Sequence, residues 1–148
     1  MSMDASTIPH QDLTYKIIGC AMQVHGELGP GLKEAHYHRA MSVRLQEAGL
    51  SFEEEKPVEL EIDGTAIGLL YLDHLVEGHV IVEEKALSHL LTQEEIAQVV
   101  TYLAATGLSV GLLLNFGRKS LEYKRILPPN KLDAWRDRIR RYVWTAGQ

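Results

Sequence analysis

The chain contains 148 residues, of which 45% are hydrophobic and 24% are charged, and its formal net charge at pH 7 is −5. A chain of this length can bury a core of its own, so we expect one domain over residues 1–148, and the composition excludes intrinsic disorder. No apolar run is long enough to span a membrane, and we expect no secretory signal. With a single cysteine, Cys20, these features predict a cytoplasmic protein.

The charge is distributed unevenly along the chain. Residues 1–117 carry 6 Lys and Arg against 17 Asp and Glu, whereas residues 118–148 carry 9 against 3. A basic end beside an acidic body suits a phosphate-binding face or contact with another subunit's acidic surface. The same composition is equally typical of a solvated helix face, and both interpretations stay open at this point.

Hydrophobic periodicity predicts helices first and strands after them. Residues 1–11 lack periodicity and are expected to form a loose tail. A first helix should end at Gly29-Pro30-Gly31, and a second should run over residues 32–48. The period then changes to two, which predicts a strand over 57–62, a turn at Asp63-Gly64, one or two strands over 66–76 and a further strand over 79–87.

The C-terminal half alternates again between the two periods. Thr92 and Glu95 form a capping box that begins a helix ending at Gly107. We expect a central strand over residues 108–116, an edge strand over 121–125 and a basic helix within 131–148. The sequence therefore predicts one α/β domain with the order α-α-β-β-β-α-β-β-α.

One group of polar residues suits hydrolytic chemistry. Residues two apart on a strand share a face, so Glu83 and Lys85 point the same way and Glu84 points to the opposite face. A three-residue turn at 77–79 would place Asp73 directly across from Glu83, whereas a two-residue turn would direct Asp73 away. Paired carboxylates suit Mg²⁺ or Mn²⁺, and a nearby lysine can stabilise charge developing on phosphorus. The alternative is a strand-end aspartate beside a plain Glu83–Lys85 ion pair.

Two helices can bring further polar groups to this patch. Gln98 and Tyr102 lie four residues apart, so they share one face of the helix that follows the Glu83–Lys85 strand. Glu34 lies near the start of the second predicted helix. Packing in the core for Tyr102 and simple surface exposure for Gln98 are the alternatives.

Gly31, Glu34 and Tyr37 match the Gly-x-x-Glu-x-x-Tyr signature, and the chain resembles the GxxExxY protein family in order over about residues 14–127. Further matching segments are 28–31, 72–76, 80–86, 97–98, 102–108, 110–117 and 124–126. That family is similar to the PD-(D/E)XK nuclease superfamily. The resemblance implies a central mixed sheet flanked by helices, with a metal at Asp73 and Glu83.

The resemblance also implies roles for single residues. Lys85 would orient water, Glu34 would assist as an acidic residue, and Gln98 with Tyr102 resembles the Q-x-x-x-Y element of RecB-type exonucleases. Two residues depart from the family pattern: Glu84 replaces a usually apolar residue, and His38 follows the signature tyrosine where family members often have an acidic residue.

These observations favour a Mg²⁺- or Mn²⁺-dependent nuclease acting on nucleic acid, with DNA favoured over RNA and no association with membranes. We expect Tyr102 and Arg125 to contact the substrate, with the basic segment 118–141 near its path. One alternative is a non-catalytic protein of the same fold that assembles with itself or a partner through Trp135, Tyr142 and Trp144. Another is a binding module for a small phosphorylated ligand. A homo-oligomer is expected because the domain is small.

Overall fold

The computed structural model describes residues 8–128. The predicted order of elements is confirmed over this part of the chain. The elements are α1 (Gln11–Leu28), α2 (Glu34–Glu47), β1 (Phe52–Ile62), β2 (Thr65–Val76), β3 (Val80–Lys85), α3 (Gln93–Thr106), β4 (Val110–Asn115) and β5 (Glu122–Ile126). The helix predicted within 131–148, with Trp135, Tyr142 and Trp144, and most of the expected N-terminal tail lie outside the described residues.

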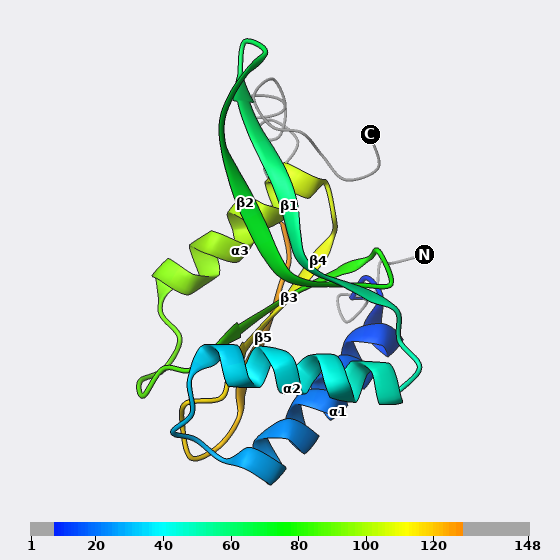
Figure 1. Ribbon diagram of the computed structural model, residues 1–148, viewed down its shortest axis with the longest axis vertical. Helices are drawn as coiled ribbons and strands as arrows, with labels where there is room; N and C mark the ends of the chain where they lie inside the picture. Colours follow the sequence, from blue (N-terminus) through cyan, green and yellow to red (C-terminus); the bar gives the residue numbers. More distant parts are fainter. Residues whose placement is uncertain (1–7, 129–148) are drawn as a thin grey trace, which may run out of the picture.

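A five-stranded mixed sheet in the order β1-β2-β3-β4-β5 forms the centre of the fold. β3 and β4 are parallel and are joined through α3, while the other neighbouring strands are antiparallel. Helices α1 and α2 cover one face and α3 covers the other (Figure 1). The predicted α/β class is therefore confirmed.

The structure differs from the sequence prediction at several boundaries. Helix α1 begins at Gln11, the last residue of the expected tail, and residues 66–76 belong to the single strand β2. Strand β1 begins at Phe52 rather than at residue 57, because its charged N-terminal half pairs with β2 along an exposed edge. Edge strands tolerate charged side chains. The acidic residues 53–55 therefore lack the apolar alternation by which a strand is predicted, although they form part of β1.

The alternating side chains of the central strands divide the core into two parts. Val80 and Val82 of β3 face α1 and α2, whereas Ile81 faces α3. Because successive residues of a strand point to opposite faces, the same alternation extends into the polar end of β3. Glu83 and Lys85 therefore continue the α3 face, and Glu84 continues the face of α1 and α2.

The β1–β2 hairpin projects beyond the body of the domain (Figure 1). Its tip is the predicted turn at Asp63-Gly64, where both residues have positive φ, at 50° and 79°. This combination is typical of a tight turn whose twist matches that of the flanking strands. Within residues 8–128, no helix combines the length and the apolar character that crossing a membrane requires.

The loop after β3 is fixed by the end of β4. The side chain of Asn115 accepts hydrogen bonds from Leu87 N and Gly117 N and donates one to His89 O. Gly117 packs directly on the backbone of this loop, where an added Cβ would lie 2.5 Å from Leu87 N. Only glycine fits at this position without displacing the segment that joins β3 to α3.

We predict that Gly117→Ala lowers the free energy of unfolding by about 1–3 kcal/mol, because the new methyl group overpacks a contact with backbone that cannot rotate away. Urea unfolding followed by circular dichroism measures the change. The matched control is Gly19→Ala on α1, where no atom lies within 4 Å of the added Cβ. This control should gain about 0.5–1 kcal/mol, and equal effects of the two substitutions would contradict the assignment.

Candidate active site

The turn between β2 and β3 sets the register of the site. The strands pair His74 with Val82 and Val76 with Val80, so the turn comprises the three residues 77–79. Its first two residues, Glu77 and Gly78, have positive φ. The three-residue turn needed to bring Asp73 level with Glu83 is therefore present.

Asp73 and Glu83 are held by each other's strands. Asp73 N donates a hydrogen bond to Glu83 Oε2 at 2.8 Å, and Glu84 N donates one to Asp73 Oδ2 at 3.0 Å. Each carboxylate thus uses one oxygen to bind the backbone of the neighbouring strand. The two acidic groups are fixed side by side at the polar end of the β2–β3 pair.

Burial makes this pair costly to ionise. Glu83 is 3% exposed, and desolvation together with the Asp73 charge raises its pKa to about 9. Desolvation and the Glu84 charge raise the pKa of Asp73 to about 6. A cation between such carboxylates would relieve the repulsion, and hard oxygen ligands suit Mg²⁺ or Mn²⁺. The donor set therefore fits a divalent cation.

Helix α3 contributes the side-chain amide of Gln98 and the phenol of Tyr102, whose four-residue spacing puts them on one face of the helix. Lys85 Nζ donates a hydrogen bond to Gln98 Oε1 at 2.9 Å. Tyr102 is 6% exposed, and burial together with the nearby charges of Glu83 and Asp73 raises its pKa to about 12. Gln98 thus holds the Lys85 ammonium, and the ring of Tyr102, one turn further along α3, is mostly buried in the core.

The signature tyrosine fixes the start of α2 rather than entering the site. Tyr37 is fully buried, its hydroxyl donates to Gly29 O at 2.6 Å and accepts from Leu32 N, and its ring stacks on Phe116. Gly31 has a φ of 106°, a conformation that favours glycine. These contacts present Glu34, the first residue of α2, at the mouth of the site.

Glu34 is close to the other candidate residues but makes no direct bond to them in the described hydrogen bonds. Partial desolvation raises its pKa, and the Lys85 ammonium opposes this effect. Glu34 and Asp73 also line one cavity of about 490 Å³. The candidate residues come from four elements and lie near enough for their charges to act on one another, but Lys85 and Gln98 line a second cavity of about 350 Å³ rather than the one lined by Glu34 and Asp73.

Arg125, which was expected from the sequence to contact substrate, lies elsewhere. Its register partner on β4 is Leu112, which faces α1 and α2, and its Nε donates to Thr14 on α1 at 3.2 Å. The structure does not bring Arg125 to the carboxylates. Most of the basic segment 118–141 lies outside the described residues.

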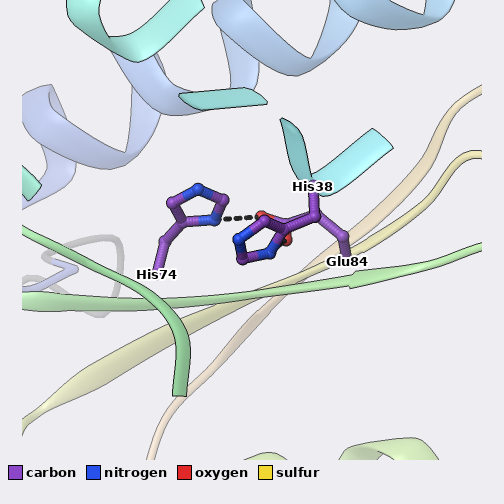
Figure 2. Close-up of side chains that lie close together, drawn as sticks. All are labelled: His38, His74 and Glu84. Atoms are coloured by element: carbon purple, nitrogen blue, oxygen red, sulfur yellow. Dashed lines mark hydrogen bonds and ion pairs between the residues drawn. The ribbon is translucent and has the colours of Figure 1, made fainter. Parts of the chain in front are cut away.

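On the opposite face of β3, Glu84 is fully buried between two histidines (Figure 2). His74 Nδ1 donates to Glu84 Oε2 at 2.7 Å, and His38 Nδ1 donates to Glu84 Oε1 at 3.1 Å. The two rings stack with centroids 4.2 Å apart. The hydrogen bond to Glu84 raises the pKa of His38. Glu84 and His38, the two departures from the family pattern, are thus direct partners.

Sequence reasoning missed His38 and Glu55 as residues of this region. Both line the same cavity as Glu34 and Asp73. Nothing in the local spacing indicates this, because only the tertiary fold brings α2 beside β1. The one signal in the sequence was the pair of departures at positions 38 and 84.

The sequence of this chain was compared with protein-family models, curated proteins and solved structures. A family model described as PD-(D/E)XK nuclease superfamily matches residues 11–126. No curated protein and no solved structure matches the chain significantly.

We predict that the stability of the metal-free protein falls as the pH rises from about 4.5 to 9. Folded Glu83 keeps its proton to about pH 9, whereas an unfolded glutamate loses it near its ordinary value of 4.5, so the folded state binds more protons across this range. Glu83→Gln should remove much of this slope and unfold with a free energy higher by on the order of 1 kcal/mol or more at about pH 8.

Urea unfolding in EDTA at several pH values measures this effect. The control is Glu94→Gln at an exposed position of α3, which should leave the slope unchanged. If the wild type and Glu83→Gln lose stability in parallel as the pH rises, the assignment of the buried proton to Glu83 is wrong.

Proposed function

This chain belongs to the PD-(D/E)XK nuclease superfamily, and we propose that it hydrolyses phosphodiester bonds of nucleic acid with a divalent cation held by Asp73 and Glu83. The observation that carries this proposal is the reciprocal bonding of Asp73 and Glu83 across β2 and β3. It holds two carboxylates side by side near the end of β3 that carries Lys85, and such an arrangement suits a metal-dependent phosphodiesterase.

Asp73 and Glu83 each have a carboxylate oxygen that is not used in the two backbone hydrogen bonds, and these oxygens would hold the cation. The cation, when bound, polarises a phosphate oxygen and makes water a stronger nucleophile. Lys85 would position the attacking water and stabilise negative charge on phosphorus. Gln98 orients the Lys85 ammonium through its hydrogen bond, so it is a positioning residue. Glu34, at the entrance of the site, can accept a proton.

Finer assignments follow from the same residues. Gly31, Glu34 and Tyr37 support placement in the GxxExxY subfamily, and the oxygen ligands favour Mg²⁺ or Mn²⁺. We propose DNA over RNA as substrate, a cytoplasmic location, a single nuclease domain over residues 1–148 and a homo-oligomer. We also propose that Tyr102, which lies one helical turn from Gln98 on α3, contributes to substrate binding.

We predict that Asp73→Asn and Lys85→Ala each reduce metal-dependent cleavage of DNA by at least about 100-fold, because each removes charge from the reacting centre. Gln98→Ala should cause a smaller loss, since Lys85 remains but is no longer held. Cleavage of linear, circular and single-stranded DNA, and of RNA, in Mg²⁺, in Mn²⁺ and in EDTA measures the rates.

Lys16→Ala on the exposed side of α1 is the control and should retain full activity. Cleavage that persists in Asp73→Asn and Lys85→Ala would come from a contaminant. Without any cleavage by the wild type, the non-catalytic interpretation of this fold would replace the nuclease proposal.

A further inference from the structure

We infer that His38, Glu55 and Asp73 form a divalent-cation site with one nitrogen ligand, and that Glu84 orients the histidine for it. The inference extends the proposed function, because Asp73 belongs to both sets of residues. The other two residues lie outside the Asp–Glu–Lys group, and they come from α2 and β1.

The three ligand groups converge at one place. One ligand atom from each of His38, Glu55 and Asp73 lies within 4.8 Å of the other two. His38 Nε2 is 3.9 Å from Glu55 Oε1. Two ligands that each bind an ion at about 2.1 Å can be no more than about 4.2 Å apart, so this separation already suits a shared ion.

The backbone of β1 places Glu55 at the level of Asp73. Pairing with β2 passes from Glu54 and His74 to Lys56 and Leu72, which leaves Glu55 beside Asp73. Glu55 has a φ of 50°, an uncommon conformation for a residue with a Cβ in the middle of a strand. Left-handed backbone at a non-glycine residue often accompanies function, and here it occurs at the residue facing the cavity.

His38 is oriented as metal-binding histidines usually are. Its Nδ1 donates to the fully buried Glu84, which leaves Nε2 directed toward Glu54 and Glu55. A carboxylate that holds the second ring nitrogen fixes the tautomer and increases the basicity of the ligand nitrogen. The second oxygen of Glu84 accepts from His74, so Glu84 cannot swing away (Figure 2).

A second group of potential ligands, His38, His74 and Glu84, is less suited to an ion. Both oxygens of Glu84 already accept hydrogen bonds from the Nδ1 atoms of the two histidines, and His74 and Glu84 are fully buried. His74 Nε2 also lies 2.7 Å from Ser42 Oγ, which hydrogen-bonds Glu54. This group is therefore a hydrogen-bonded network that fixes the orientation of the His38 ring.

The cavity in front of His38 has the charge that a cation needs. It is about 490 Å³ in volume, and its lining includes four carboxylates, those of Glu34, Glu54, Glu55 and Asp73, against one guanidinium, that of Arg39. Imidazole nitrogen is a better ligand for Mn²⁺, Co²⁺ and Zn²⁺ than for Mg²⁺. The site should therefore bind these ions in preference to Mg²⁺.

The test is metal binding by the full chain, measured without reference to cleavage. Titration with Mn²⁺ is followed by electron paramagnetic resonance, and titration with Co²⁺ is followed by visible absorption and by the NMR signals of the histidine rings. In the wild type, Co²⁺ should shift the ring signals of His38 but not those of the exposed His89. Excess Mg²⁺ should displace this Co²⁺ only weakly.

Glu55→Gln and His38→Gln should each weaken this binding at least tenfold, whereas the control His89→Gln should not. Glu55 has a side chain that is 63% exposed, so its substitution tests the site without disturbing the core. Glu84→Gln should weaken binding about 10–100-fold while His38 is retained, as expected of a positioning residue. Glu83→Gln should leave the Co²⁺ shift of His38 in place.

Unchanged Co²⁺ and Mn²⁺ binding in Glu55→Gln and His38→Gln overturns the inference, even if the protein cleaves DNA. Binding that depends on both residues supports it, even if no cleavage is found, in which case only the proposed function fails. The two proposals are therefore separable.

Discussion

The hydrogen bonds that tie Asp73 to β3 and Glu83 to β2 are the interaction on which the site depends. They require the two strands to be in one particular register, which the three-residue turn at 77–79 sets. They also hold the buried Glu83 and the half-buried Asp73 at a distance where their charges repel, so ionising both groups destabilises the folded state. The remaining polar groups of the site are arranged around this pair.

Strand β3 separates two polar networks by the alternation of its side chains. On the α3 face, Lys85 and Gln98 form the approach to Glu83. On the face of α2, the buried side chain of Glu84 is hydrogen-bonded to the buried His74 and to His38 at the edge of the cavity. Asp73 connects the two networks, because its carboxylate accepts from Glu84 N while its own backbone donates to Glu83.

The sequence could predict what depends on local pattern. Helical and strand periodicity located the elements, but the sequence left open whether the turn after Val76 has two or three residues, and the position of Asp73 relative to Glu83 depends on that length. The four-residue spacing of Gln98 and Tyr102 predicted their shared face. Periodicity could not predict that β1 begins at Phe52, because the acidic residues there follow edge exposure rather than burial. Periodicity also could not predict that His38 lies close to Glu55, since their proximity depends on how α2 packs beside the β1–β2 hairpin.

The turn at 77–79 has a consequence for how this chain can diverge. Loops elsewhere can gain or lose residues at small thermodynamic cost. A single deletion that shifted the β2–β3 pairing by one residue would instead exchange the faces of every later side chain on β3. Glu84 would then take the place of Glu83, and both networks would be lost in one step. Sequence changes in this segment must therefore keep the β2–β3 register that the turn sets, together with the two carboxylates.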